Sequence, residues 1–373
     1  MIQLLIRLVC AYLYSALYKI RDYHQNAIVT VVIPVYNEYE DLLHDSIVSV
    51  LMSSHKNIEV IVVDDGSTHP VHLSPDIADK VKLIRLSHNQ GKMRAQAEGI
   101  YQSSSESQFV LTVDSDTTIG IYAIERMLSQ FDSETGAVCG EVQISNVLGL
   151  NRVIQFLYWN AFNIWRAGSS VFGQVMVCSG AISMYRKSPL LSCSHPEHDY
   201  PGGILQEYLD RNIEVGNDRF MTFLFLKHGW KTRYAGNAVA LTDAPFQIAK
   251  FVKQQVRWNK SFWRGLFYSW PVYGFKNWYF TLDMFLKAIS RITTMLLFVW
   301  TIVLMFRGSW ETVGWILFIA LIYGVMHSAA GLIVTRRLSF LLFSIWAILS
   351  IFLVAPVNIW SILTVWKDKW GTR

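Results

Sequence analysis

Acidic residues gather in two short segments of the N-terminal half, and each segment follows a run of β-branched residues. Asp64 and Asp65 precede Gly66, and Asp114 and Asp116 flank a serine. Carboxylates after the first run can hydrogen-bond the base and ribose of a nucleotide, and glycine permits a close backbone turn there. The second pair can share a divalent cation with a diphosphate, because Mg²⁺ is usually held by one or two carboxylates plus phosphate oxygens. The two segments therefore predict a site for a nucleoside diphosphate and its metal ion.

A lysine between the two acidic segments fits the same chemistry. Lys92 ends the sequence Asn-Gln-Gly-Lys at residues 89–92, and its ammonium is a candidate second cation for the diphosphate. An isolated pair of aspartates indicates little, since acidic residues commonly end strands and cap helices. The order of these segments along the chain is what favours a nucleotide site.

The elements that must position these residues alternate regularly between residues 27 and 131. Strand-like runs occupy residues 28–35, 58–67, 81–87 and 109–116, and helical patterns occupy residues 38–52, 91–104 and 119–131. This βαβα order predicts an α/β domain with a Rossmann-like, mostly parallel sheet and helices on both faces. Ligands of such sheets bind at the carboxyl ends of the strands, and both acidic segments fall there.

The composition excludes several classes of protein. Of the 373 residues, 52% are hydrophobic and 16% are charged, whereas soluble domains carry roughly 25% charged residues. A purely soluble, disordered or collagen-like chain is therefore not expected. The net charge of +5 together with 14% aromatic residues favours a lipid bilayer over nucleic acid as the partner. The four cysteines lack paired spacings and are interpreted as reduced thiols.

Apolar residues are concentrated after residue 248. Residues 313–334 carry no formal charge and are long enough to span a bilayer. Residues 281–306 begin with charged positions and become apolar, so this helix is expected to enter the bilayer from a polar interface. Residues 2–20 are apolar apart from Arg7 and Lys19 and predict a retained anchor or an interfacial helix.

A third apolar run, residues 340–355, is shorter and is followed by Pro356, which disrupts helix continuation. Basic residues on both sides of this run favour a cytoplasmic location for both flanks. The run therefore predicts a re-entrant or interfacial segment, and an ordinary third span with its tail outside is the alternative. Residues 150–166 and 248–268 are amphipathic. The basic residues of the second stretch favour the membrane surface, and the first could equally be a buried helix.

Several motifs together resemble a known family. The segments that resemble the glycosyltransferase family 2 domain are residues 34–38 (PVYNE), 63–67 (VDDGS) and 114–116 (DSD). Its processive, membrane-embedded branch, which includes cellulose, chitin and hyaluronan synthases, has signatures similar to residues 178–181 (CSGA), 216–219 (GNDR) and 254–258 (QQVRW). Within that branch, residues 242–246, 254–264 and 370–373 (WGTR) resemble hyaluronan synthases most.

The resemblance implies a GT-A fold and inverting transfer from UDP-sugars, in which an acceptor hydroxyl attacks the anomeric carbon and UDP leaves. The acceptor must lose a proton to a carboxylate within hydrogen-bond reach, and the resemblance assigns this role to Asp218. The leaving diphosphate would be stabilised by Mg²⁺ or Mn²⁺ on Asp116, with help from Asp114, and by Lys92 and Arg257.

Other roles also come from the resemblance. Trp258 and the segment Cys178, Ser179 and Gly180 are expected to contact the acceptor, although tryptophan is also a common membrane-interface anchor. Arg373 is expected to bind the diphosphate, since a guanidinium can bind two phosphate oxygens at once. The chain departs from the family where Asn217 precedes Asp218 in place of the usual acidic pair, where Glu141 replaces aspartate, and in its shorter N-terminal membrane portion.

The chain is therefore expected to be a processive inverting β-glycosyltransferase. It would polymerise UDP-glucuronate and UDP-N-acetylglucosamine into a hyaluronan-type polysaccharide and translocate the nascent polysaccharide across the plasma membrane. A chitin-oligosaccharide synthase and a non-processive glycosyltransferase acting on a lipid carrier are the alternatives. The expected parts are a membrane or interfacial helix (1–23), a cytosolic GT-A domain (24–245), interfacial helices (246–275) and a transmembrane region with a re-entrant segment (276–373).

Overall fold

The computed structural model describes residues 2–18, 24–149, 151–195, 198–200, 202–211 and 216–367. The chain forms two compact units. The sheet unit comprises Tyr18–Asn146 and Phe172–Ala244, and the helical unit comprises Met1–Leu17, Val147–Val171 and Pro245–Arg373. Residues 147–171, which we expected within the GT-A domain, thus group with the apolar helices.

The sheet unit is built on an eight-stranded sheet in the order β3-β2-β1-β4-β7-β6-β10-β5. Its strands are β1 (Val29–Val35), β2 (Ile58–Asp64), β3 (Val81–Arg85), β4 (Phe109–Val113), β5 (Thr117–Ile119), β6 (Thr135–Ile144), β7 (Ile182–Arg186) and β10 (Lys231–Thr242). The neighbours β3, β2, β1 and β4 run parallel, as do β6 and β10, while β7 runs antiparallel to both β4 and β6. The predicted mostly parallel α/β sheet is confirmed, in a mixed form.

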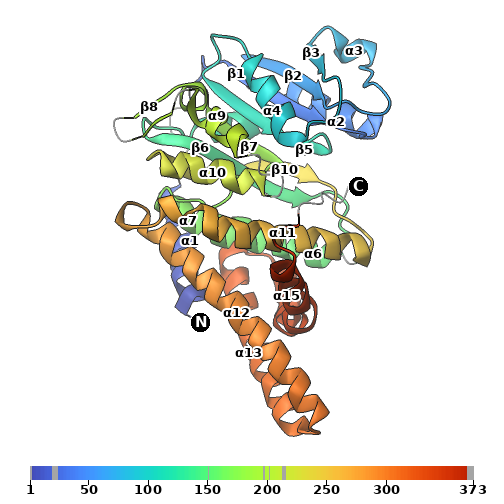
Figure 1. Cartoon of the computed structure of the whole chain (residues 1–373), viewed down its shortest axis with the longest axis vertical. Coiled ribbons are helices and arrows are strands. Elements are labelled where there is room, and N and C mark those ends of the chain that lie inside the picture. The colour runs from blue at the N-terminus through green and yellow to red at the C-terminus, as the bar shows by residue number, and fades with distance from the viewer. Residues whose placement is uncertain are drawn as a thin grey trace. The chain divides into compact units, whose positions relative to one another are not determined.

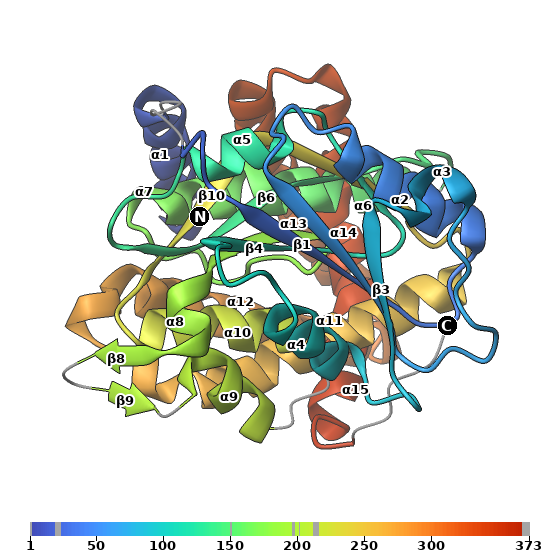
Figure 2. The same cartoon turned by 90° about the horizontal axis from the view of Figure 1, so that it is seen from above.

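Helices cover this sheet on both faces, as Figure 2 shows from above. They are α2 (Glu40–Leu51), α3 (Pro75–Ala78), α4 (Lys92–Tyr101), α5 (Ala123–Leu128), α8 (Lys187–Leu191), α9 (Gly203–Asp210) and α10 (Asn217–Lys227), with a small hairpin of β8 (Cys193–His195) and β9 (His198–Tyr200). Every residue of β1 and β4 is buried. That pattern is typical of central strands covered on both faces.

The helix predicted at residues 119–131 is shorter than expected. Thr117–Ile119 forms β5, which pairs antiparallel with β10, and α5 begins only at Ala123. β-Branched residues favour strands, and here an edge pairing that lies far away in sequence overrides the local helical pattern. The turn between β4 and β5 carries Asp114 and Asp116.

The helical unit contains α1 (Ile2–Leu17), α6 (Asn151–Trp159), the π-helix η1 (Asn160–Arg166), α7 (Ala167–Val171), α11 (Ile248–Tyr268), η2 (Trp270–Val272), η3 (Phe275–Asn277), α12 (Trp278–Phe306), α13 (Trp310–Thr335), η4 (Leu338–Ile345), α14 (Trp346–Leu349), η5 (Ser350–Val354) and α15 (Ala355–Leu363). Three helical stretches of the described residues are long and apolar enough to span a membrane: Phe275–Phe306, Trp310–Val334 and Trp346–Leu363. Figure 1 shows α12 and α13 side by side as a hairpin. The amphipathic helix predicted at 248–268 is confirmed as α11.

The helix of the third stretch is longer than we expected, and its re-entrant or interfacial course stays a prediction. Pro356 does not end a helix, because it stands in the first turn of α15, directly after the π-helix η5. The missing proline N–H falls directly after the π-helical turn of η5, where the regular α-helical hydrogen bonding has already changed. The helical path therefore continues to Leu363, which makes this stretch as long as a candidate span.

A buried ion cluster joins α1 to α12 within the helical unit. Arg7 donates to Asp283 through Nε at 3.1 Å, and Lys287 pairs with the other Asp283 oxygen at 2.7 Å. The cationic groups of Arg7 and Lys287 also lie 4.8 and 5.2 Å from the ring centroid of Trp165. Because buried charges need partners, this cluster fixes the N-terminal helix against α12.

Candidate active site

The first acidic segment forms a tight loop at the end of β2. Asp64 accepts the Ser67 N–H at 2.8 Å and pairs with Arg85 at 2.6 Å. Gly66 has φ +67°, and a Cβ there would lie 2.5 Å from the carbonyl carbon of His88. Only glycine fits such a position. Asp64 therefore shapes the loop, and its predicted contact with a nucleotide stays a prediction.

The neighbouring carboxylate reaches the loop that leads into α4. Asp65 accepts the N–H groups of Gln90 at 2.7 Å and Gly91 at 2.9 Å. Burial raises the pKa of Asp65, and the two backbone hydrogen bonds oppose that rise. Asp65 thereby fixes the backbone directly before Lys92.

Lys92 brings the second acidic segment into the same site. It is the first residue of α4 and forms an ion pair with Asp114, which follows β4. Although burial disfavours its charge, Asp114, Asp218 and Asp116 together raise the pKa of Lys92 above its ordinary value. The lysine is therefore charged and faces three carboxylates.

The carboxylates after β4 offer a partial metal site. Asp116 accepts hydrogen bonds from the hydroxyls of Thr117 at 3.3 Å and Thr242 at 3.5 Å. Among the described residues, no group of three or more His, Cys, Asp or Glu side chains lies close enough together to hold a metal ion. Two carboxylates with hard oxygen donors nevertheless fit Mg²⁺ or Mn²⁺ when substrate phosphates supply the remaining ligands.

Asp218 approaches the same place from α10. One of its oxygens, Oδ2, accepts the Gly180 N–H at 3.0 Å. A Cβ at Gly180 would lie 2.7 Å from both this oxygen and Lys92 Nζ. The absence of a side chain at Gly180 therefore lets the two charged groups converge on one stretch of backbone.

The segment predicted to contact the acceptor is tied to the same helix. The Cys178 N–H donates to the Thr222 hydroxyl at 2.9 Å, and that hydroxyl donates to the Asp218 carbonyl at 2.7 Å. Residues 178–180 and the first two turns of α10 consequently form one hydrogen-bonded group.

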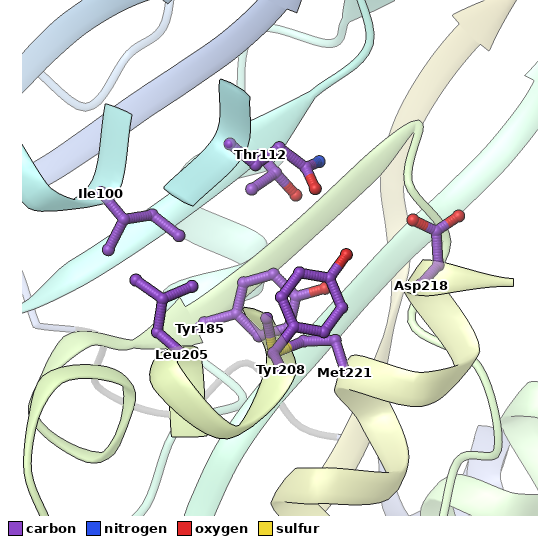
Figure 3. Close-up of a pocket in the computed structure, with 8 residues that line it drawn as sticks. Ile100, Thr112, Tyr185, Leu205, Tyr208, Asp218 and Met221 are labelled. Atoms are coloured by element: carbon purple, nitrogen blue, oxygen red, sulfur yellow. The ribbon is translucent and has the colours of Figure 1, made fainter. Parts of the chain in front are cut away.

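A small pocket lies beside Asp218 (Figure 3). It is lined by Gln96, Ile100, Thr112, Tyr185, Leu205, Tyr208, Asp218 and Met221. Burial, together with the negative charge of Asp218, raises the pKa of both tyrosines well above the ordinary range. Sequence reasoning missed these tyrosines, because Tyr208 belongs to an ordinary apolar helical pattern with no motif around it.

The predicted site residues are thus divided between the two units. The sheet unit contains Asp64, Asp65, Lys92, Asp114, Asp116, Cys178, Ser179, Gly180 and Asp218. Arg257 and Trp258 lie on α11 of the helical unit, where the Trp258 ring meets Tyr158 edge-to-face at 5.8 Å. Arg373 lies outside the described residues.

Comparison with known proteins identifies the family of this chain. The family model described as Glycosyl transferase family 2 matches residues 30–192. A hyaluronan synthase of Streptococcus pyogenes is 33% identical, with 99% of this chain and 88% of that protein covered. An N-acetylglucosaminyltransferase of Mesorhizobium japonicum is 32% identical, with 92% of this chain and 81% of that protein covered.

Among solved structures, the mannosyltransferase PcManGT from Pyrobaculum calidifontis, in complex with GDP-Man and Mn²⁺, shares the fold. Its TM-score is 0.58 at 15% identity, with 98% of this chain and 96% of that chain covered. The sheet is therefore of the GT-A type, as the sequence motifs implied. Since the relatives match nearly the whole chain, this protein is a glycosyltransferase and belongs to glycosyl transferase family 2, among the relatives of hyaluronan synthase.

Proposed function

We propose that this chain is a processive, inverting β-glycosyltransferase that joins UDP-glucuronate and UDP-N-acetylglucosamine into a hyaluronan-type polymer. The observation that carries the proposal is the convergence of Lys92, Asp114 and Asp218 beside the backbone of Gly180. A cation suited to a diphosphate and a carboxylate suited to a hydroxyl proton lie within one site. The names of the relatives support the choice of sugars.

The donor side of the proposal concerns the diphosphate. Asp114 and Asp116 would hold Mg²⁺ or Mn²⁺, which supplies charge stabilisation for the leaving UDP. The Mn²⁺ and GDP-mannose in the PcManGT structure support a metal-bound nucleotide sugar on this fold. Lys92 would contact the diphosphate directly, so its ion pair with Asp114 must rearrange when the donor binds.

The acceptor side requires a base. Asp218 would accept the proton of the acceptor hydroxyl. The oxygen of that hydroxyl would at the same time bond to the anomeric carbon, from the face opposite the diphosphate. The bond from the anomeric carbon to the phosphate oxygen breaks, and its electron pair leaves with UDP. The Gly180 N–H fixes one carboxylate oxygen, which sets the orientation of the other.

The remaining residues would act around this step. Trp258 would offer its ring face to an acceptor sugar, while Arg257 and Arg373 would bind the diphosphate. Cys178 and Ser179 would position the acceptor through the backbone that they share with Gly180.

The helical unit contains three stretches that are long and apolar enough to cross a membrane, and they support a membrane location for the chain. We assign it a multi-pass arrangement in the plasma membrane with the sheet unit in the cytoplasm, where UDP-sugars are available. Arg336 and Arg337 after α13 and Lys367 near the described C-terminal end support a cytoplasmic location for both flanks of the third stretch, which would then enter and leave the membrane on the same side while α12 and α13 cross it. The polymer would then leave through the membrane as it grows.

A second function, synthesis of chitin oligosaccharides, is favoured by the N-acetylglucosaminyltransferase relatives. The test is to incubate the purified full-length protein with each UDP-sugar alone and with both, and then to measure product size and sugar composition. A long polymer that forms only from both sugars would support our proposal. Short oligomers made from UDP-N-acetylglucosamine alone would contradict it and support the second function.

A further inference from the structure

Glu38 lies in the loop between β1 and α2, and both of its carboxylate oxygens accept hydrogen bonds. The Tyr39 N–H donates to Oε1 at 3.3 Å, and the Ser115 hydroxyl donates to Oε2 at 2.9 Å. Tyr39 directly precedes α2, and Ser115 lies in the turn between β4 and β5. A single carboxylate therefore connects the start of α2 to the turn that carries the proposed metal ligands.

This turn is a β-turn with Ser115 and Asp116 as its two central residues, because the Thr117 N–H donates to the Asp114 carbonyl at 3.1 Å. Asp114 follows the last residue of β4, a strand that is buried throughout. The Asp116 carboxylate accepts the hydroxyls of Thr117 and Thr242 at 3.3 and 3.5 Å, which are long hydrogen bonds. The place of Asp116 relative to Asp114 consequently depends on what holds Ser115 between them.

Helix α2 holds the neighbouring backbone of the same segment through two serines. The Ser46 hydroxyl donates to the Asp114 carbonyl at 3.3 Å, and the Ser49 hydroxyl accepts the Ile119 N–H at 3.0 Å. The helix also packs against β5 (Figure 1). The loop before α2 and the helix itself thus follow the segment from β4 to β5, and Glu38 is the member of this set that reaches a side chain between the two aspartates.

Glu38 is suited to hold the turn and is not placed as a third metal ligand. In the part of the chain that the structure describes, no three acidic, histidine or cysteine side chains are close enough to share a cation. Ser115 is 8% exposed, so its hydroxyl needs a partner within the protein. A hydrogen bond to an ionised carboxylate is roughly twice as strong as one between neutral groups.

We propose that Glu38 is a positioning residue for the metal site, which acts through Ser115 to fix Asp116 relative to Asp114. This inference rests on the proposed binding of Mg²⁺ or Mn²⁺ by those two aspartates. Mg²⁺ demands near-ideal octahedral geometry, so a shift of the turn that moves one carboxylate weakens the site. Groups that hydrogen-bond the surroundings of metal ligands typically contribute about 10–100-fold to metal affinity.

Three substitutions separate the hydrogen bond from the charge. Glu38→Ala removes the acceptor of the Ser115 hydroxyl. Glu38→Gln removes the negative charge but keeps a carbonyl oxygen that can accept the same hydroxyl. Glu40→Ala is the matched control, because it removes an exposed glutamate two residues further along, in the first turn of α2.

The experiment uses the full-length protein in detergent and measures Mn²⁺ affinity at saturating UDP, from the electron paramagnetic resonance signal of free Mn²⁺. UDP affinity in chelator and the thermal midpoint are measured in parallel. We expect Glu38→Ala to weaken Mn²⁺ binding about tenfold or more. Glu38→Gln should weaken it less than about threefold, and Glu40→Ala less than about twofold.

UDP affinity in chelator should stay within about twofold of wild type in every variant, since the effect runs through the metal ligands. Equal losses of Mn²⁺ affinity in Glu38→Ala and Glu38→Gln would assign the effect to charge and overturn the proposal. A loss of UDP affinity in chelator would place Glu38 on the nucleotide and overturn it as well.

Ser115→Ala tests the route from the other side of the hydrogen bond, and it also serves if Glu38→Ala fails to fold. It should weaken Mn²⁺ binding about as much as Glu38→Ala, and the double variant should lose no more than the worse single variant. Additive losses would overturn the route.

Asp116→Ala separates this inference from the proposed metal site. Unchanged Mn²⁺ affinity in Asp116→Ala would remove the metal site and the inference with it. Weak Mn²⁺ binding in Asp116→Ala, beside normal binding in both Glu38→Ala and Ser115→Ala, would refute only the positioning role.

Discussion

Gly180 has no side chain, and two charged groups from different helices approach it. A Cβ there would lie 2.7 Å from Asp218 Oδ2 and from Lys92 Nζ. The glycine thereby allows Lys92, which we propose binds the diphosphate, and Asp218, the proposed base, to face one small volume. The proposed sugar transfer needs both groups around a single anomeric carbon.

Asp116 gives the most direct test of the metal at the residue scale. Asp116→Ala should weaken UDP binding about tenfold in Mg²⁺ or Mn²⁺, because it removes one of two carboxylates from the cation. When a chelator removes the metal ion, the same substitution should alter the UDP affinity by less than about twofold. Titration of the purified protein with UDP in both conditions measures this difference. Asp79→Ala, which removes an exposed carboxylate, serves as the control, and equal weakening with metal and with chelator would exclude the metal role.

The residues of the site differ in how well the sequence predicts them. Asp64, Asp65, Asp114 and Asp116 follow β-branched runs, and the parallel sheet brings the ends of such runs to one edge. Tyr208 has no such signal, because its place in the pocket depends on the packing of α9 against α10. The sequence also could not show that Asp64 forms an ion pair with Arg85, which lies on the neighbouring strand.

At the scale of elements, the pair α9 and α10 depends on a buried carboxylate. Burial disfavours the charge of Glu207, yet hydrogen bonds from His228 and Lys227 lower its pKa from 4.5 to about 2. A carboxyl group whose pKa is lower in the folded chain than in the unfolded chain contributes its full stabilisation at pH values above its unfolded pKa. This stabilisation is lost as the pH falls through its folded pKa. The contribution is about 3 kcal/mol at neutral pH.

Glu207→Gln should therefore lower the thermal midpoint most at pH 7, and the difference from wild type should shrink as the pH falls from about 4.5 towards about 2. Thermal unfolding of both proteins between pH 7 and pH 3 measures it. Glu106→Gln is the control, because it makes the same change of side chain at an exposed position. A difference that is independent of pH would show that the Glu207 charge does not hold the two helices.

Elements of the helical unit were only partly predictable. Residues 281–306 and 313–334 carry continuous apolar patterns, and the structure has α12 and α13 there. The continuation past Pro356 could not be predicted, since it depends on the π-helical turn of η5. The grouping of residues 147–171 with this unit follows from contacts of α7 and η1 with α1, and no local pattern encodes such tertiary contacts.

At the scale of the whole molecule, the chain crosses between its two units several times. The helical unit is assembled from the N-terminal helix, an internal segment and the C-terminal third. A buried ion cluster of Arg7, Asp283 and Lys287 connects the first and last of these. The sheet unit carries most of the residues of the proposed transfer chemistry, and the helical unit carries the candidate spans, as the proposed synthesis and export by one chain would require.

We propose that this chain couples two-sugar polymerisation to passage of the product through the membrane. The direct measurement uses the full-length protein in sealed liposomes, with both UDP-sugars and Mg²⁺ supplied outside and only the outward-facing sheet units active. We predict a labelled polymer that resists added hyaluronan lyase until detergent opens the vesicles, and no polymer with Asp218→Asn. A polymer that the lyase degrades fully without detergent would exclude coupled export, and no polymer from the paired sugars would exclude two-sugar polymerisation.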